Sequence, residues 1–308
     1  MTRVAAIDCG TNSIRLLVAD VVDGVLTDVT RQLEIVRLGE GVDRTGRLAP
    51  EAIERTRVAV ADYAGRLAVL GVQRVRMVAT SATRDAANAD EFRGMVVATL
   101  GTAPEVVSGD EEARLSFTGA VRGLPAGTPE PFLVVDIGGG STEFVRGGST
   151  DGSTVDAAVS VDVGCVRMTE RHLHGDPPTA AEVAVAEADI TAAVDRALAT
   201  VDGHAVRTLL GLAGSVTTVA AIALGLPSYQ AERIHHARVS TVDVEKVTAD
   251  LLTATRAQRL ALPVMHPGRA DVIAAGALIL RVTMQRAGAD AVIASEHDIL
   301  DGIAYGLA

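Results

Sequence analysis

Two segments of the chain carry the same pattern, an apolar run followed by D-x-G-x-x-S. Residues 7–18 read I-D-C-G-T-N-S-I-R-L-L-V, and residues 135–145 read V-D-I-G-G-G-S-T-E-F-V. In each copy the apolar run leads to an aspartate and a glycine turn, and a hydroxyl and a second apolar run follow. Glycine lets the backbone approach an anion closely, and successive amides in such a turn can donate to phosphate oxygens. The pattern therefore predicts two β-hairpins that bind a phosphate chain.

The two turns supply a first set of candidate binding residues. The candidates for phosphate binding are Gly10, Asn12, Ser13, Gly138, Gly139, Gly140 and Ser141. An aspartate beside a phosphate would repel it unless a divalent cation lay between them. Mg²⁺ binds through few carboxylates, several waters and substrate phosphates. Asp8 and Asp136 are therefore predicted as ligands of a Mg²⁺ cofactor.

A third turn of this kind lies in G-L-A-G-S-V-T-T-V-A-A, residues 211–221. An apolar run ends at Gly214 and Ser215, and a helical pattern follows over residues 216–224. Ser215 is expected to be the N-cap of that helix, and a helix N-terminus is a natural anion site. A capped helix without a ligand is the alternative.

Two well-known phosphate motifs are missing from the sequence. No G-x-x-x-x-G-K-[ST] pattern occurs, and the chain's only lysine is Lys246, which excludes a P-loop nucleotidase. Residues 138–140 do not continue into G-x-G-x-x-G, and the segment after them resembles a strand rather than a helix. Hydride transfer with a dinucleotide is therefore not expected.

Composition narrows the class of protein further. The net charge of −11 and an aromatic content of 2% argue against a nucleic-acid-binding protein, which needs a basic face with stacking aromatics. Cys9 and Cys165 lie far apart without metal-site spacing, so reduced thiols are expected. No run approaches the ~20 apolar residues of a membrane span. A cytoplasmic protein without membrane contact is expected.

The order of strand and helix patterns indicates two α/β lobes. Each half begins with three strand patterns in a row, and helical patterns alternating with single strands follow. The Pro/Gly-rich stretch at residues 123–131 is the expected boundary, which divides the chain into lobes 1–124 and 125–308. A helix is expected to start at Arg269, and the final helix is expected to start at Glu296.

Four motifs, two of them not yet described, extend the pattern along the chain. These are A-T-S-A-T-R-D-A-A-N at residues 79–88, S-G-D-E-E-A-R-L-S-F at 108–117, D-I-G-G-G-S-T-E at 136–143, and the turn at 214–215. In this order and with the first hairpin, they resemble the exopolyphosphatase and guanosine pentaphosphate phosphohydrolase family over nearly the whole chain. The resemblance implies two actin-like, ribonuclease H-like lobes, each on a five-stranded sheet, with the active site in the cleft between them.

The resemblance also implies roles for three acidic residues. Glu112, directly before Ala-Arg, matches the family's general base. Its neighbours Asp110 and Glu111 are expected only to complement the helix dipole, as acidic residues at a helix N-terminus commonly do. Glu143 and Asp136 match the family's second acidic pair, in which Glu143 would orient water or the metal.

Arginines and hydroxyls would complete the phosphate site. Arg15, Arg84 and Arg269 match phosphate-binding positions of the family. Thr80 and Ser81 precede Arg84, and their hydroxyls are expected to donate to the phosphate chain. Arginine suits this role because it stays charged and binds phosphate bidentately.

The sequence thus predicts a Mg²⁺-dependent exopolyphosphatase that removes terminal orthophosphate from inorganic polyphosphate. The alternative is a guanosine pentaphosphate 5′-phosphohydrolase, an activity of the stringent response that would use the same apparatus. Compared with the family's long members, the chain resembles the two-lobe core without the additional carboxy-terminal domains. Its acidic surface is expected to repel distant phosphates, so short chains are expected to be favoured. A homodimer is left open.

Two other classes are less consistent with the motifs. An ATP-dependent kinase or actin-like binding protein of the same superfamily is disfavoured by the acidic helix start and by the missing nucleoside-binding insertion. A regulator that binds polyphosphate without cleaving it is disfavoured because Asp8, Glu112, Asp136 and Glu143 are all present.

Overall fold

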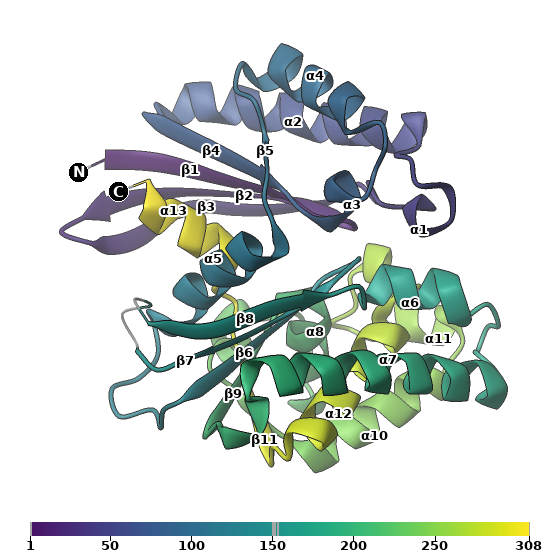
Figure 1. Ribbon diagram of the computed structural model, residues 1–308. Helices are drawn as coiled ribbons and strands as arrows, with labels where there is room; N and C mark the ends of the chain where they lie inside the picture. The colour runs from purple at the N-terminus through teal and green to yellow at the C-terminus, as the bar shows by residue number, and fades with distance from the viewer. Residues whose placement is uncertain (1, 150–151, 153, 308) are drawn as a thin grey trace. The chain divides into compact units, whose positions relative to one another are not determined.

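The computed structural model describes residues 2–149, 152 and 154–307 of the chain. The backbone separates into two compact units, one formed by Met1–Gly119 with Ile299–Ala308 and the other by Ala120–Asp298. Each unit contains one β-sheet with helices packed on it (Figure 1). The α/β class that the sequence predicted is therefore confirmed.

The first unit holds a five-stranded sheet in the order β3-β2-β1-β4-β5. Its strands are β1 (Thr2–Cys9), β2 (Ser13–Val22), β3 (Val25–Ile35), β4 (Arg74–Ala79) and β5 (Glu105–Val106). Its helices are α1 (Val42–Thr45), α2 (Pro50–Leu70), α3 (Ser81–Arg84), α4 (Ala89–Leu100), α5 (Gly109–Val121) and α13 (Ile299–Gly306). The meander β1-β2-β3 is antiparallel, and β4 and β5 continue the sheet in parallel from β1.

Alternation along β1 gives this sheet two buried faces. Ala5 and Ile7 belong to one apolar cluster with side chains of α2 and α4, whereas Val4 and Ala6 belong to another with Ile303 of α13. Successive side chains of a strand point to opposite faces, which explains the division. Helices α2 and α4 thus cover one face, and α13 covers the other (Figure 1).

The carboxy-terminal helix therefore belongs to the first unit. The sequence analysis had included it in a second lobe spanning residues 125–308 and had started it at Glu296. In the structure α13 begins at Ile299, and its apolar side chains close the core under β1 and β2. A division by linear sequence could not detect this return of the chain. The other boundary, between Gly119 and Ala120, precedes the 123–131 stretch.

The second unit holds a six-stranded sheet in the order β10-β11-β9-β6-β7-β8. Its strands are β6 (Phe132–Ile137), β7 (Thr142–Gly147), β8 (Val155–Val161), β9 (Thr208–Leu212), β10 (Arg238–Ser240) and β11 (Ala291–Ala294). Its α-helices are α6 (Cys165–His172), α7 (Ala180–Val201), α8 (Ala213–Ala223), α9 (Ala231–Ile234), α10 (Thr241–Thr253), α11 (Arg256–Leu260) and α12 (Ile273–Ala287), and its 3-10 helices are η1 (Gly203–Ala205) and η2 (Pro267–Arg269).

The two sheets repeat one topology. Read from one edge, β8-β7-β6-β9-β11 corresponds strand by strand to β3-β2-β1-β4-β5, with the same antiparallel and parallel pairings. The short β10, antiparallel to β11, is an additional sixth strand, so the expectation of five strands in each lobe is wrong for the second. The repeated D-x-G-x-x-S pattern thus lies between equivalent strands, at the β1-β2 and β6-β7 turns.

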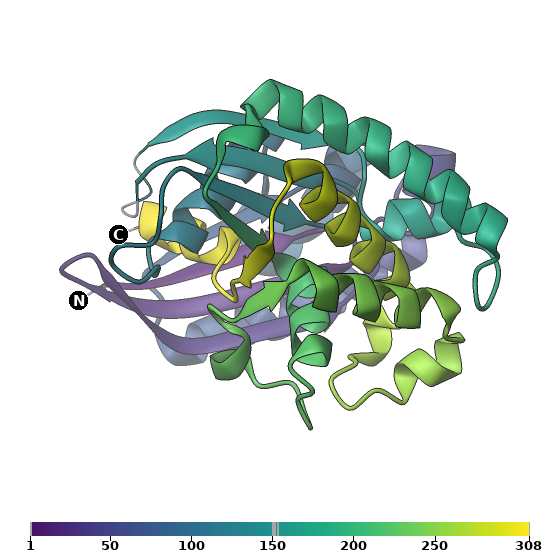
Figure 2. The same ribbon diagram turned by 90° about the horizontal axis from the view of Figure 1, so that it is seen from below.

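The core of the second unit is almost entirely aliphatic. Helix α12 packs between α7 and α10 (Figure 2), and its residues from Ile273 to Leu280 are all buried. Together with the inward side chains of β6, these helices form one apolar cluster. Within the described residues, no helix combines the length and the hydrophobicity that crossing a bilayer requires.

Two glycines of α13 offer a test of its packing in the first unit. A Cβ atom on Gly302 would overlap the carbonyl oxygen of Leu115 in α5, whereas a Cβ on Gly306 would meet nothing within 4 Å. We expect Gly302→Ala to lower the free energy of unfolding by ~1–3 kcal/mol, as overpacking does. Gly306→Ala should leave it nearly unchanged. Denaturant unfolding of both variants measures the difference, and equal values would contradict the packing of α13 on α5.

Candidate active site

The first predicted hairpin is closed by a hydrogen bond between its two ends. The N–H of Gly10 donates to the carbonyl oxygen of Ser13 at 3.0 Å. The carbonyl oxygen of Asn12 accepts from the N–H groups of Val36 and Arg37 at 3.1 and 2.8 Å. The loop after β3 therefore holds the turn from one side and fixes its conformation.

Asp8 and Arg15 form an ion pair at the base of this hairpin. They are direct cross-strand partners in the β1-β2 register, and Arg15 Nη2 lies 2.6 Å from Asp8 Oδ2. Asp8 is only 4% exposed. The structure thus brings two predicted site residues together, and the guanidinium neutralises the carboxylate that was predicted to hold Mg²⁺.

Helix α3 connects the hairpin to helix α5. The hydroxyl groups of Thr11 and Ser81 are 2.9 Å apart, and Thr80 and Ser81 are both buried. At the other end of α3, Arg84 Nη1 donates to Glu112 Oε2 at 3.1 Å and to the carbonyl oxygen of Val107 at 2.9 Å. Four predicted residues, Thr80, Ser81, Arg84 and Glu112, therefore belong to one connected group in the first unit.

The three acidic residues at the start of α5 differ in their surroundings. Asp110 is exposed and pairs with Arg114 one turn along the helix at 2.8 Å. Glu111 is exposed and pairs with Arg76 at 2.6 Å. Glu112 is buried, with 8% of its surface exposed. Only Glu112 of the three is turned into the unit, which agrees with the distinction that the sequence analysis made.

The second hairpin has the same closing bond and a different acidic pair. The N–H of Gly138 donates to the carbonyl oxygen of Ser141 at 3.0 Å. Asp136 and Glu143 are direct cross-strand partners and are 7% and 1% exposed. Glu143 Oε1 accepts from the Ser160 hydroxyl of β8 at 2.7 Å. The prediction that both acids face the same side of the hairpin is therefore consistent with the register.

Asp136 and Glu143 are a pair of oxygen donors that fits Mg²⁺. Like charges directly opposite each other in a sheet are destabilising, and a bound cation would remove that cost. Across the residues that the structure describes, no group of three or more His, Cys, Asp or Glu side chains forms a complete metal cage. Mg²⁺ does not require one, because water and substrate phosphates supply its other ligands. Asp136 and Glu143 suit this mode, whereas Asp8 lies in the first unit beside Arg15.

The third predicted turn differs from its expected form. Helix α8 begins at Ala213, its N-cap is Leu212, and no side chain caps it. The prediction that Ser215 is the N-cap is therefore wrong. Ala213 has a positive φ of 66°, so the chain turns sharply at the end of β9 and the helix starts earlier than the polar residues indicate. Ser215 is instead buried in the first turn, where a side chain on Gly276 would overlap its hydroxyl.

Arg269 reaches this turn through its side chain. Its guanidinium lies against Gly214, where a Cβ atom would overlap it, and Nη1 donates to the Thr218 hydroxyl at 3.2 Å. Arg269 is the last residue of η2, and α12 begins only at Ile273. The expectation that Arg269 starts the helix is wrong, but the structure places it beside the predicted turn.

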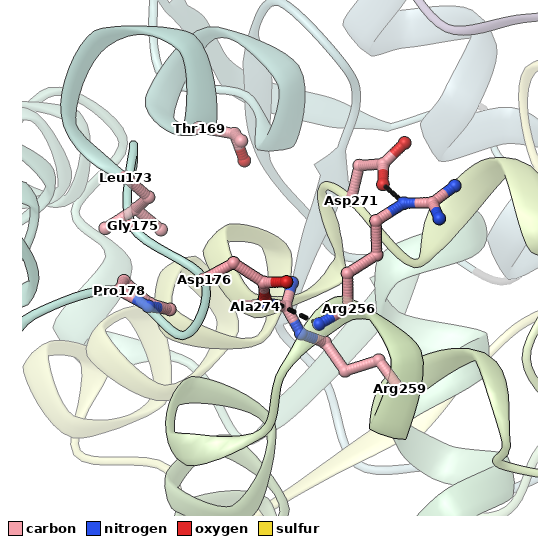
Figure 3. Close-up of a pocket in the computed structure, with 9 residues that line it drawn as sticks. All are labelled: Thr169, Leu173, Gly175, Asp176, Pro178, Arg256, Arg259, Asp271 and Ala274. Carbon is pink, nitrogen blue, oxygen red and sulfur yellow. Dashed lines mark hydrogen bonds and ion pairs between the residues drawn. The ribbon is translucent and has the colours of Figure 1, made fainter.

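A cavity of about 210 Å³ is lined by residues that include Arg256, Arg259 and Asp271 (Figure 3). Arg256 pairs with Asp271, and Arg259 Nη2 lies 3.4 Å from Asp176 Oδ1. Arg259 is 4% exposed and donates to the carbonyl oxygen of Ala270 at 2.9 Å. Both guanidinium groups thus lie beside carboxylates, and Arg259 holds the backbone next to Arg269.

The sequence analysis missed two buried residues, one beside Ser215 and one that binds the residue after Arg269. Cys165 lies beside Ser215: burial is the main influence on its thiol and raises its pKa, although a hydrogen bond with Ser215 and the charge of Arg269 oppose this. Arg259 was missed because nothing in the sequence separates it from the other 26 arginines. Only its burial in the structure distinguishes it.

Comparisons with known proteins show what the whole chain is similar to. The chain is 53% identical to exopolyphosphatase 2 of Mycobacterium tuberculosis, in an alignment that covers 100% of this chain and 99% of that protein. It is 31% identical to the bifunctional 3-dehydroquinate synthase/phosphatase of Fusobacterium nucleatum, over 97% of this chain and 45% of that protein.

The fold of this chain is also similar to those of solved structures. An exopolyphosphatase-like protein, structural genomics target BlR13, superposes with a TM-score of 0.96 at 43% identity, covering 99% of this chain and 97% of that one. The Aquifex aeolicus member of the Ppx/GppA family superposes with a TM-score of 0.83 at 31% identity, with the same coverage. The sequence matches the Ppx/GppA phosphatase family over residues 17–308. With its duplicated sheets and its two glycine hairpins, this chain belongs to the Ppx/GppA phosphatase family.

Proposed function

We propose that this chain is a Mg²⁺-dependent exopolyphosphatase that hydrolyses the terminal phosphoanhydride bond of inorganic polyphosphate and releases orthophosphate. The observation that carries the choice of substrate is the 53% identity, over the full chain, to the exopolyphosphatase 2 of Mycobacterium tuberculosis. The arrangement of residues within each unit supports the chemistry.

Glu112 is the proposed general base. Hydrolysis of a phosphoanhydride needs an in-line water, a group that accepts its proton and stabilisation of charge on the phosphoryl oxygens. Arg84 donates to the carboxylate of Glu112, and an adjacent cation favours the ionised form that can accept a proton. Burial removes Glu112 from bulk water, whereas Asp110 and Glu111 are exposed and paired elsewhere.

Asp136 and Glu143 are the proposed Mg²⁺ ligands, with Glu143 also able to orient water. When bound, the ion would neutralise charge on the phosphoryl oxygens of the substrate. The two side chains, cross-strand partners in the β6-β7 hairpin, would hold the metal there. Asp8 Oδ2 lies 2.6 Å from Arg15 Nη2. Asp8 is proposed to balance the positive charge of Arg15 in the first hairpin.

The remaining predicted residues are proposed to bind phosphates. The proposed donors are the turn residues Gly10, Asn12, Ser13, Gly138, Gly139, Gly140 and Ser141, the hydroxyls of Thr80 and Ser81, and the Gly214-Ser215 turn with Arg269. Arg15 and Arg84 would share their guanidinium groups between the carboxylates they contact and the substrate.

The first test separates Glu112 from its neighbour. Glu112→Gln should lower the turnover number on polyphosphate by ~10² or more, the usual contribution of a general base, and it should leave the melting temperature nearly unchanged. Glu111→Gln, which loses only an exposed pair with Arg76, should retain most activity. A phosphate-release assay measures both. Equal losses would reject Glu112 as the base.

The second test concerns the metal. A chelator should abolish phosphate release, and added Mg²⁺ should restore it. Asp136→Asn should raise the Mg²⁺ concentration needed for half-maximal rate, because one anionic ligand is lost. Asp156→Asn removes an exposed carboxylate from β8 of the same sheet and serves as the control. Undiminished hydrolysis in chelator would exclude the metal role.

The third test compares substrates. With a net charge of −11, the protein repels phosphates that extend beyond its binding residues, by ~1 kcal/mol for two unit charges 4 Å apart in water. We expect short polyphosphate to be hydrolysed at least as fast as long chains, and moderate salt should raise the relative rate on long ones. Initial rates on both, and on guanosine pentaphosphate and ATP, decide between the activities. A strong preference for guanosine pentaphosphate would favour the alternative phosphohydrolase.

A cytoplasmic location is proposed on a separate ground. Cys9 and Cys165 are both buried and neither forms a disulfide, as is usual in a reducing compartment. Cell fractionation tests it. The absence of nucleic-acid binding stays a prediction, and analytical ultracentrifugation would show whether the chain forms a homodimer.

A further inference from the structure

The second glycine turn is held from behind by the start of helix α6. The N–H of Cys165 donates to the carbonyl oxygen of Gly138 at 2.9 Å, and the N–H of Val166 donates to that of Gly139 at 2.8 Å. The Arg167 side chain completes the set, because its Nε donates to the carbonyl oxygen of Gly140 at 2.7 Å. All three glycine carbonyl groups of the turn are thus bound by one helical turn.

This contact also takes the place of a helix cap. The first N–H groups of a helix have no partner within the helix and need an outside acceptor. The N-cap of α6 is Gly164, which has no side chain to accept from them. A Cβ atom at this position would overlap the backbone of Gly139 and Gly140. The close approach therefore requires glycine, and the turn itself supplies the acceptors.

The bound carbonyl groups determine where the amides of the turn point. In a trans peptide the C=O and N–H groups point in opposite directions, and the chain's cis peptides lie elsewhere, before Pro131 and Pro177. The N–H groups of Gly139, Gly140 and Ser141 are therefore directed away from α6. Over the described part of the chain, none of the three donates to a protein acceptor. Successive amides of this kind form an anion-binding concavity.

We propose that Arg167 is a positioning residue of the phosphate site. Arg167 holds the carbonyl group of Gly140, and this contact keeps the amides of the turn facing the phosphate to be bound. Its side chain is 12% exposed, and its Nη2 also lies 4.0 Å from the carboxylate of the exposed Asp162. The inference rests on the proposed function, because it assigns the support of that site's phosphate turn.

Three variants separate this role from loss of charge and from loss of stability. Arg167→Ala removes the donor to Gly140. Arg167→Gln removes the charge but keeps a nitrogen donor the same number of bonds from Cα as Nε. Arg171→Ala removes an arginine one turn further along α6, where it pairs with Asp189 at 3.2 Å, and is the matched control.

Kinetics on short polyphosphate give the first readout. Arg167→Ala should raise KM tenfold or more with a smaller change in kcat, because the amides bind phosphate in both the ground state and the transition state. Arg167→Gln should stay within about threefold of the wild-type KM, and Arg171→Ala should match the wild type. A KM in Arg167→Gln as high as in Arg167→Ala would mean that the charge acts directly, and it would overturn the proposal. So would a lower melting temperature with an unchanged KM.

A binding readout separates this proposal from the proposed function. In ¹⁵N-labelled protein titrated with orthophosphate, the amide signals of Gly139, Gly140 and Ser141 should shift. Arg167→Ala should need at least tenfold more phosphate for the same shift. If wild-type protein releases no phosphate from polyphosphate but these signals respond as expected, the function fails and the positioning role stands. If wild-type protein is active but Arg167→Ala equals Arg171→Ala in both readouts, the positioning role fails alone.

Discussion

The direction of a few peptide groups in two hairpins is the constraint on which the candidate site depends. A glycine turn can bind an anion only if its N–H groups point to the ligand, and a flexible turn would lose that direction. In both hairpins the same bond, from a glycine N–H to a serine carbonyl oxygen at 3.0 Å, closes the turn. Outside contacts then hold its carbonyl groups, from the loop after β3 in the first hairpin and from α6 in the second. Both turns are thus held by hydrogen bonds from within and from neighbouring segments.

Because the two sheets share one topology, their hairpins can be compared position by position, and they differ in the charge opposite the aspartate. Asp8 and Asp136 occupy equivalent strands, and each faces a charged residue across its antiparallel pair. The partner is Arg15 in the first unit and Glu143 in the second. A buried aspartate beside a guanidinium already has its counter-ion, whereas two carboxylates opposite each other favour a cation. One duplicated scaffold therefore carries an aspartate paired with arginine in one unit and an aspartate opposite a glutamate in the other, where Mg²⁺ is proposed to bind.

Arginine side chains contact both carboxylates and backbone groups in this protein. Arg84 and Arg15 contact carboxylates near the predicted turns, Arg269 lies against the backbone of Gly214, and Arg259 holds the carbonyl group of Ala270. Its planar group with several donors can bind a carbonyl, a carboxylate or a phosphate. An acidic protein can therefore concentrate positive charge where its backbone needs support, while its surface as a whole stays negative.

The sequence by itself determined the turns, the strand order within each hairpin and the identity of the acidic residues. These follow from local rules: glycine and hydroxyl residues fix a turn, and alternation fixes which side chains share a face. It also singled out Glu112, although only through the family resemblance. Tertiary structure decided what depends on distant partners. These are the ion pair between Asp8 and Arg15, the burial of Ser215 against Gly276, and the return of α13 to the first sheet. The support of Gly140 by Arg167 belongs with them, because residues 27 positions apart meet only when the chain has folded.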